Sequence, residues 1–335
     1  MAQIKKKVGS KTVLISPLNW GLGHASRCIP LIRKYQSEGY SVVIGADGAA
    51  RALLLREFPL LQHEEIPGFK ARYSGSLPFY LHLILRSPAF FYSMRTEHRR
   101  LMELCDKYHP ELIISDNRYG LWHRDIKSVL ITHQLFPIAP KLIQGLLHRY
   151  LFKCFERFDE IWVPDYEGEN NLSGKLSHAS KLPSNVHYVG PLSRFERKCL
   201  HSGPYEITFL GIVSGPEPYR EELFNKLKAL FKLSGKKCII VAGKPEKLEI
   251  FHEENVTIYN HLSSEEMHQF ICNSRYIISR SGYSSIMDFD KAGRKAYLIP
   301  TPGQTEQMYL AEYNDILQKH VHLKNEHDLL KLISN

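Results

Sequence analysis

Short apolar segments alternate with helical patterns along the chain, and this alternation constrains the fold more than any other feature. Helices are predicted over residues 25–38, 51–58 and 139–158. Strands are predicted over residues 13–16, 41–46, 112–115, 129–132, 160–163 and 185–190, and again over 207–213, 238–242, 256–259, 276–279 and 296–299. Strands that alternate with helices form parallel sheets with right-handed crossovers. The sequence therefore predicts an α/β protein.

The length and one polar segment divide the chain. At 335 residues it exceeds most single domains, so two domains of ordinary size are expected. The segment 191–204 is polar, basic and rich in turn residues, which is typical of a linker. We therefore expect a first domain over 1–190 and a second over 205–335. Both are predicted to be Rossmann-like and doubly wound, with a ligand cleft between them.

Composition indicates a globular protein with a basic surface. Hydrophobic residues make up 43% and charged residues 24% of the chain, and the net charge is +9. A basic surface suits nucleic acid, anionic lipid or a phosphorylated substrate. Zinc-finger spacing, a basic helical arm and an RNP-like aromatic strand are missing from the sequence, so nucleic acid is not expected as a partner.

The cysteines and the N-terminus predict a cytoplasmic protein. Six cysteines are scattered without a C-x-x-C pair or a metal-like cluster, which is typical of a reducing compartment and not of a disulfide scaffold. The apolar run 13–15 is too short for a signal peptide, and no run approaches the roughly 18 apolar residues of a membrane span.

The segment 278–311 carries the most specific chemistry. A strand runs into the turn Ser281-Gly282, and helical sequence follows as far as Gly293, a residue favoured at helix ends. A helix N-terminus after such a turn offers N–H groups to a phosphate. Asp288 lies about two turns along nearly the same face, where it can accept hydrogen bonds from a ribose. Glu306 and Gln307 suit the hydroxyls of a sugar. The alternative is an ordinary strand–helix–strand unit.

This segment resembles the donor-binding signature of GT-B glycosyltransferases that have a family 28 C-terminal domain. It is similar to that of the bacterial peptidoglycan N-acetylglucosaminyltransferase MurG. The matching residues are Arg280, Ser281, Gly282, Asp288, Gly293, Pro300 and Gln307. The sequence departs from the family pattern in having Asp instead of Glu at 288, and in lacking an Asn near Leu310 or Ala311. The resemblance implies two Rossmann-like domains, with a last helix near 306–318 that packs back on the first domain.

The loop before the first helix ends in Gly21, Gly23 and His24. Glycines at such a turn let the backbone approach a ligand, but the dinucleotide fingerprint fails because no third glycine follows. In the resembled family the histidine of this loop faces the active centre, so His24 is the candidate general base. The alternative is a structural or helix-capping histidine.

Two further polar residues follow buried strands of the first half. Asp116 and His133 are candidates to orient His24, and His133 is also a candidate to contact the acceptor. The alternative for each is a structural polar residue whose hydrogen bonds are satisfied.

In the second half, strand ends supply further candidates for donor binding. Ser214 and Gly215 resemble a reduced form of the family's phosphate loop. Lys244, His261 and Leu262 end the next two strands, where relatives of the family cradle the base through main-chain groups.

The segment 68–100 mixes aromatic and aliphatic residues with arginines. This pattern is typical of an interfacial membrane patch, and the resembled family acts on a lipid-linked acceptor. The alternative is a core helix with a wall that binds the acceptor.

Together these features predict an inverting, metal-independent glycosyltransferase of the hexosyltransferase type. The donor is a nucleoside-diphosphate sugar, UDP being favoured by the resemblance, and no cofactor is expected. The acceptor is a hydroxyl group of a lipid-linked or cell-envelope glycan, and the protein is expected to be peripheral on the inner face of the membrane. Two alternatives remain: a nucleotide-sugar hydrolase or epimerase on the same fold, and a catalytically silent nucleotide-binding partner subunit.

Overall fold

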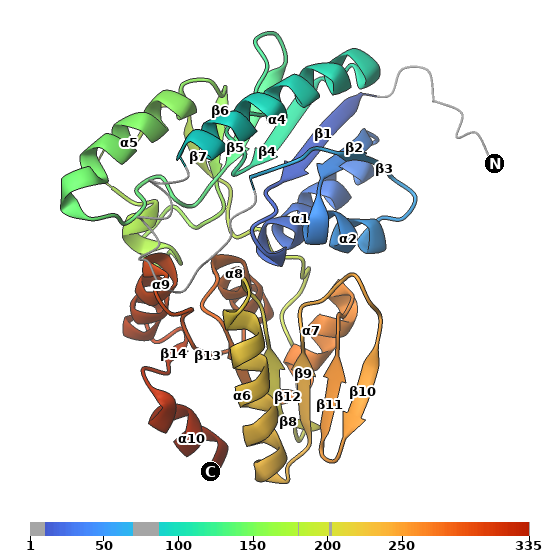
Figure 1. The fold of residues 1–335 in the computed structure, drawn as a ribbon, viewed down its shortest axis with the longest axis vertical. Helices are drawn as coiled ribbons and strands as arrows, with labels where there is room; N and C mark the ends of the chain where they lie inside the picture. Colours follow the sequence, from blue (N-terminus) through green and yellow to red (C-terminus); the bar gives the residue numbers. More distant parts are fainter. Residues whose placement is uncertain (1–10, 70–86, 180, 201–202, 335) are drawn as a thin grey trace.

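The protein folds into two α/β domains, each built on a seven-stranded sheet (Figure 1). The computed structural model describes residues 11–69, 87–179, 181–200 and 203–334. The strands of the first sheet all lie before residue 189 and those of the second all lie after residue 206. The segment between them crosses once from one domain to the other.

The N-terminal sheet is parallel, with strand order β3-β2-β1-β4-β5-β6-β7. Its strands are β1 (Thr12–Pro17), β2 (Ser41–Ala46), β3 (Gln62–Glu65), β4 (Leu112–Asp116), β5 (Lys127–Ile131), β6 (Glu160–Val163) and β7 (Val186–Tyr188). Its helices are α1 (Leu22–Ser37), α2 (Gly48–Glu57), α4 (Ser87–Tyr108), α5 (Lys141–Phe155) and the short η1 (Gly174–Leu176). Every residue of β1 is buried, as expected for a central strand covered on both faces.

The C-terminal sheet has strand order β10-β11-β9-β8-β12-β13-β14, with β10 antiparallel to its neighbour. Its strands are β8 (Ile207–Ile212), β9 (Cys238–Val241), β10 (Ile250–Glu253), β11 (Val256–Tyr259), β12 (Ser274–Ser279), β13 (Tyr297–Leu298) and β14 (Val321–His322). Its helices are α6 (Tyr219–Ser234), α7 (Ser264–Asn273), α8 (Tyr283–Ala292), α9 (Thr305–Ile316) and α10 (Glu326–Ser334).

Alternate residues of the central strand β8 face two separate cores. Leu210 and Ile212 join the core beneath α7, α8 and α9, whereas Phe209 joins the core beneath α6 and α10. This period of two, with apolar residues on both faces, is what a strand between two helical layers requires. The α/β class predicted from the alternation of elements is therefore confirmed as two Rossmann-like domains.

Three strands at or near the sheet edges were missed by the sequence analysis. The residues of β3 are all polar, Gln-His-Glu-Glu, so they lack an apolar pattern. The strand β14 has only two residues, and β10 pairs only with β11, in an antiparallel ladder on the outer side of the sheet. Edge positions bury little surface, which removes the hydrophobic signal on which prediction depends.

The two domains are joined by polar contacts as well as by the chain. The hydroxyl of Tyr283 donates to the carbonyl of Pro164 at 2.8 Å, and Asn314 Nδ2 donates to the carbonyl of Leu172 at 3.1 Å. The Ser264 N–H and hydroxyl both donate to Glu57 Oε1, at 2.9 and 2.7 Å. The helix α9 thus packs against the N-terminal domain (Figure 1).

Two of the six cysteines contradict the sequence analysis. Cys199 and Cys272 form a disulfide, and His268 lies beside them, which the cysteine pattern, typical of a reducing compartment and without a metal-like cluster, did not predict. The two cysteines are 73 residues apart, so their spacing carries no signal. The other four cysteines are free and buried.

None of the helices in the described part of the chain combines the length and the apolar character that a membrane crossing needs. Most of the aromatic and aliphatic residues predicted to form a membrane patch fall between 70 and 86 and lie outside the described residues.

Candidate functional site

A cavity of about 650 Å³ lies between the domains, at the carboxyl ends of both sheets. In each sheet the strand order changes direction beside the first strand, at β1 and β4 in one domain and at β8 and β12 in the other. Loops at such switch points leave a crevice where ligands of open α/β sheets bind. The two crevices face each other, and their loops line this single cavity.

Most of the predicted site residues meet in this cavity, although they are spread over nearly the whole chain. Those that line it are Gly21, Gly23, His24, His133, Ser214, Gly215, His261, Gly282, Asp288, Glu306 and Gln307. Asp116 lies directly behind His24 and is fully buried.

Besides Asp116, four predicted residues do not line the cavity. The Arg280 guanidinium donates to the carbonyls of Pro300 and Tyr219, at 2.9 and 2.7 Å, and its burial lowers its pKa to about 10. Ser281 donates to the carbonyl of Gln307 at 2.7 Å, and Leu262 lies in the core. Lys244 borders a separate surface pocket. The position of a residue at a strand end thus predicted its loop correctly, but it did not predict the direction of its side chain.

His24 and Asp116 form a hydrogen-bonded pair. His24 stands in the first turn of α1, directly after a tight turn in which Gly21 has a φ of 83°, and Asp116 ends the neighbouring strand β4. The His24 Nδ1 atom lies 2.8 Å from Asp116 Oδ1. The Arg27 Nη2 atom lies 2.9 Å from the same Nδ1 atom. A guanidinium only donates and an ionised carboxylate only accepts, so Nδ1 has a partner in either tautomer. In the tautomer that donates to Asp116, the Nε2 atom of His24 is left as the proton acceptor.

Arg27 holds this pair together and was missed by the sequence analysis. Its guanidinium makes two hydrogen bonds to the Asp116 carboxylate and lies 3.2 Å from His133 Nδ1. Burial alone raises the pKa of the Asp116 carboxyl, but Arg27 and His24 lower it more, and the net pKa is about 2. The position of Arg27, three residues after His24 on the same helix face, is the signal that could have identified it.

His133 and Glu306 join the domains across the cavity. His133 Nε2 lies 2.8 Å from Glu306 Oε1, and Gln134 Nε2 donates to Glu306 Oε2 at 2.5 Å. Burial, with smaller contributions from the Arg27 and His24 charges, lowers the pKa of His133, so its ring is neutral. The ring stacks on Tyr283 of the other domain, with centroids 4.1 Å apart. A neutral ring that accepts from Arg27 at Nδ1 therefore donates to Glu306 at Nε2.

Asp288 is held by the segment that links the domains. Ser193 donates to Asp288 Oδ1 at 2.7 Å, and Arg194 Nε donates to Oδ2 at 2.9 Å. Burial raises the pKa of Asp288, although both partners oppose the shift. Arg194 also lines the cavity, so it is a second site residue that the sequence analysis did not identify. The ribose contact predicted for Asp288 stays a prediction.

Asp288, Phe289 and Asp290 form a D-x-D triplet, which the expectation of a metal-free site did not take into account. Residues i and i+2 of a helix do not face each other. Asp290 instead accepts a hydrogen bond from the Tyr166 hydroxyl at 2.8 Å and lies 3.9 Å from the Lys319 ammonium. The two carboxylates therefore do not act as one ligand pair.

Close approach of the two domains depends on Gly23. The Ser284 hydroxyl donates to the Gly23 carbonyl at 2.8 Å, and a Cβ added at Gly23 would lie 2.8 Å from Ser284 Oγ. This contact brings the first turn of α8 against the loop that carries His24. Gly282, the N-cap residue of α8, has no side chain that could cap the helix. The first residues of α8 line the cavity.

His261 presents a neutral ring to the cavity. Burial, together with the Arg194 and Arg56 charges, lowers the pKa of His261 to about 4. Its buried Nε2 atom makes no hydrogen bond to any described residue. A buried polar atom at a cavity wall that lacks a partner is suited to form a hydrogen bond with a polar group of a ligand.

Comparisons with known proteins agree with this architecture. Residues 221–333 match the Glycosyltransferase family 28 C-terminal domain. An uncharacterized glycosyltransferase of Methanosarcina acetivorans is 26% identical over 306 residues, which covers 86% of this chain and 79% of the relative. One of Methanosarcina mazei is 24% identical over 313 residues, with the same coverage of both chains.

Solved structures share the fold over nearly the whole chain. The spinosyn rhamnosyltransferase SpnG complexed with thymidine diphosphate superposes with a TM-score of 0.63, at 15% identity, over 96% of this chain and 90% of that chain. The glycosyltransferase SnogD from Streptomyces nogalater gives 0.59, also at 15% identity, over 97% and 94%. The protein thus has the GT-B fold. The match of its C-terminal domain to family 28 and the names of its relatives support a glycosyltransferase.

We predict that Asp116→Asn weakens the pH dependence of stability. Because the pKa of Asp116 is lower in the folded protein than its ordinary 3.8, the carboxylate stabilises the fold above pH 4, and this contribution is lost as the pH falls toward 2. Between pH 6 and pH 3 the free energy of unfolding should fall by about 1 kcal/mol more in the wild type than in the variant. Urea unfolding at both pH values measures this difference, and equal losses would contradict the assignment.

Proposed function

We propose that the protein is an inverting glycosyltransferase that transfers a sugar from a nucleoside-diphosphate sugar to a hydroxyl group, without a metal ion. The observation that carries this proposal is the His24–Asp116 pair, in which the tautomer that donates to Asp116 leaves Nε2 as a base in a cavity that the start of α8 also lines. A base and a helix N-terminus in one cavity suit a reaction in which a proton leaves the acceptor while charge develops on a diphosphate.

In the proposed reaction, His24 Nε2 takes the proton of the acceptor hydroxyl. The hydroxyl oxygen forms a bond to the anomeric carbon while the bond from that carbon to the diphosphate breaks, which inverts the configuration. Asp116, ionised and paired with Arg27, stabilises the imidazolium that forms on His24. The N–H groups at the start of α8 and in the loop at Ser214 and Gly215 stabilise the leaving diphosphate.

The C-terminal side of the cavity supplies the donor contacts in this proposal. Asp288 and Arg194 hold the ribose and phosphate region, Gln307 and Glu306 hold the sugar, and His261 contacts the nucleoside. The named complex of SpnG with thymidine diphosphate supports a nucleoside diphosphate as ligand on this fold. The resemblance of the segment 278–311 to the family 28 signature favours UDP among the bases.

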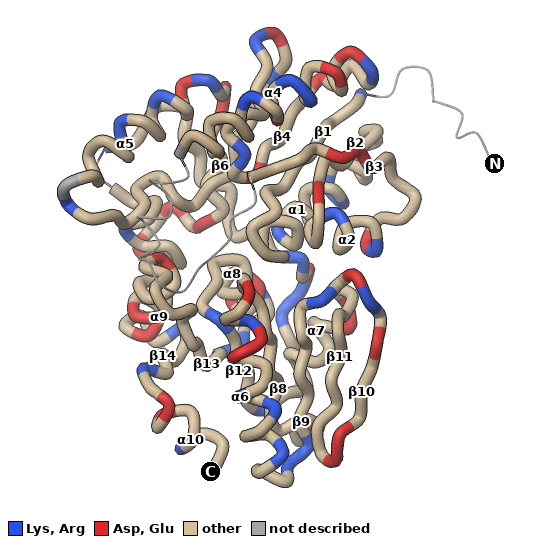
Figure 2. Tube along the Cα trace, viewed as in Figure 1, with Lys and Arg blue, Asp and Glu red and all other residues tan. Residues whose placement is uncertain are grey.

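The exposed surface of α4 and α5 supports a peripheral membrane location and a lipid-linked acceptor, such as a cell-envelope glycan. Phe91, Tyr92 and Leu146 expose 45%, 71% and 70% of their surface, and the rings of Phe91 and Tyr150 join the two helices at 5.4 Å. Arg95, Arg149 and Lys153 are exposed on the same helices, and Figure 2 shows the basic residues along α5. Apolar side chains beside basic ones suit an anionic lipid surface.

Calorimetric titration with UDP, GDP, dTDP and CMP tests the donor site. We expect saturable binding of one diphosphate with a Kd in roughly the micromolar range, unchanged by EDTA. Asp288→Ala should weaken binding about tenfold, because it removes a ribose acceptor and leaves Arg194 unpaired. Asp290→Ala is the matched control, since Asp290 contacts Tyr166 and Lys319 outside the cavity lining. Binding of none of the nucleotides would refute the proposal.

The role of His24 is tested with the diphosphate sugar identified by that titration and a panel of lipid and glycan acceptors. His24→Ala should lower the rate of transfer by about 10²–10⁴-fold and leave nucleotide affinity unchanged. His252→Ala, at an exposed position on β10, should have no effect. Release of free sugar by the wild type without any acceptor would favour a hydrolase, and nucleotide binding without turnover would favour a silent partner subunit.

Co-sedimentation with lipid vesicles tests the membrane surface. The wild type should bind vesicles that contain about 30% phosphatidylserine and not pure phosphatidylcholine, because both basic and apolar residues contribute. The double variant Tyr92→Ser, Leu146→Ser should lose most of this binding. Leu233→Ser, which changes a leucine that is 85% exposed on α6, is the control. If the double variant binds the vesicles as well as Leu233→Ser does, the membrane contact lies outside α4 and α5.

A further inference from the structure

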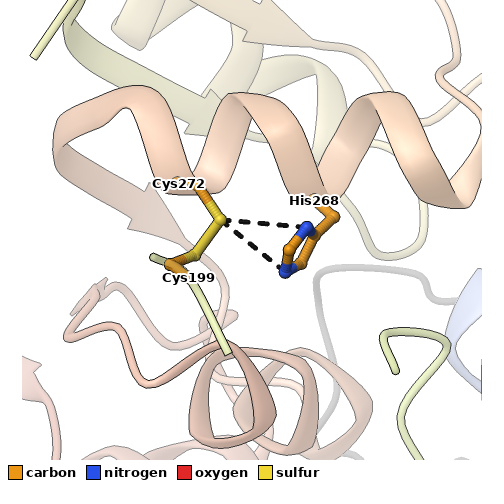
Figure 3. Close-up of side chains that lie close together, drawn as sticks. All are labelled: Cys199, His268 and Cys272. Atoms are coloured by element: carbon orange, nitrogen blue, oxygen red, sulfur yellow. Dashed lines mark hydrogen bonds between the residues drawn. A yellow bond between two sulfur atoms is a disulfide. The ribbon is translucent and has the colours of Figure 1, made fainter. Parts of the chain in front are cut away.

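Three side chains with sulfur and imidazole groups meet outside the cavity (Figure 3). Cys199 belongs to the segment between the domains, and His268 and Cys272 lie one turn apart on α7. The two sulfur atoms are bonded, and the His268 ring nitrogens lie 3.6 and 3.8 Å from Cys272 Sγ. Both cysteines are only partly buried.

The hydrogen bonds of His268 orient its ring toward the disulfide. His268 Nε2 lies 3.0 Å from the carbonyl of Arg197, and a carbonyl only accepts, so Nε2 carries the proton. The lone pair is therefore on Nδ1, 3.8 Å from Cys272 Sγ. An imidazole in this position can accept the proton of a thiol, which favours the thiolate that takes part in disulfide exchange.

The disulfide fixes the segment that lines the cavity. Within residues 193–199, Ser193 and Arg194 hold the Asp288 carboxylate, and Arg197 receives the hydrogen bond from His268. The Cys199 N–H donates to the carbonyl of Ala292, at the end of α8, at 2.9 Å. The covalent bond to α7 lies five residues after Arg194. Opening it releases the end of the segment whose other end contacts the ligand cavity.

We propose that Cys199 and Cys272 are a reversible thiol–disulfide site whose reactant is a dithiol, and that its state sets the affinity of the cavity for its nucleotide ligand. The coupling to nucleotide affinity rests on the function proposed above; the redox chemistry does not. A thiolate of the dithiol attacks one sulfur and forms a mixed disulfide, which releases the other cysteine as a thiolate. The second thiol of the dithiol then displaces the protein. Two electrons and two protons pass to the cysteine pair, and the dithiol becomes a disulfide.

The same side chains also form a set of soft metal ligands. Two thiolates and an imidazole whose other nitrogen donates to a backbone carbonyl are typical of zinc sites. Among the described residues, no fourth histidine, cysteine or carboxylate joins the group. The bonded sulfur atoms favour the disulfide, so metal binding is an outcome that the test must distinguish.

The test compares the full-length protein before and after treatment with dithiothreitol. Free thiols under denaturing conditions should rise from four to six per chain, since four cysteines are already free. Hydrogen exchange at residues 193–199 should become faster on reduction, because the covalent tie to α7 is lost. Affinity for the nucleoside diphosphate should fall about fivefold or more. Removal of the reductant and air oxidation should restore all three values.

The double variant Cys199→Ser, Cys272→Ser should resemble the reduced protein and stop responding to dithiothreitol. Cys238→Ser, which removes a free, buried cysteine of the same domain, should respond as the wild type does. His268→Gln should slow the reduction without preventing it, because it removes the base beside Cys272.

Three results would overturn the proposal. The first is six free thiols in protein purified without reductant, and the second is one tightly bound zinc ion per reduced chain. The third is identical hydrogen exchange and nucleotide affinity in both states. If no nucleotide binds in either state while exchange at 193–199 still changes, the redox site stands and the proposed function fails.

Discussion

The buried contact between Arg27 and Asp116 is the interaction on which the candidate site depends. It joins α1 to the end of β4, and both side chains are almost completely removed from water. A buried ion pair contributes little net stability compared with packed apolar residues, because both charges lose their hydration. The ion pair instead determines positions: it keeps Asp116 ionised and holds the carboxylate beside His24 Nδ1. Arg27 also reaches His133, so one guanidinium orders both histidines of the cavity.

The cavity is assembled only when the two domains meet. Glu306 comes from the C-terminal domain, but both its carboxylate oxygens are held by His133 and Gln134 of the N-terminal domain. Ser284 similarly closes against the Gly23 carbonyl. Since these contacts use side chains that also line the cavity, ligand binding and domain closure share the same groups. A ligand that replaces one partner in these hydrogen bonds therefore shifts the equilibrium of domain closure.

Much of the site could be predicted from the sequence because strand ends are visible there. His24, Asp116, His133 and Ser214 each follow a run of apolar residues, and parallel strands bring such positions to one edge. Arg194, Arg27 and the Cys199–Cys272 pair could not be found in this way. Their roles depend on partners roughly 70 to 95 residues away, a distance that no local pattern records. Only Arg27 has a local signal as well, its place one helical turn after His24.

The sequence by itself determined the α/β class and indicated loops that line the cavity, because hydrophobic periodicity and glycine-rich turns are local properties. The tertiary structure alone decided which side chains of those loops face the cavity. Lys244 and Arg280 end strands as His261 does, yet only His261 reaches the cavity. Side-chain direction follows from packing against distant elements, and so does the pairing of Asp288 with the segment between the domains.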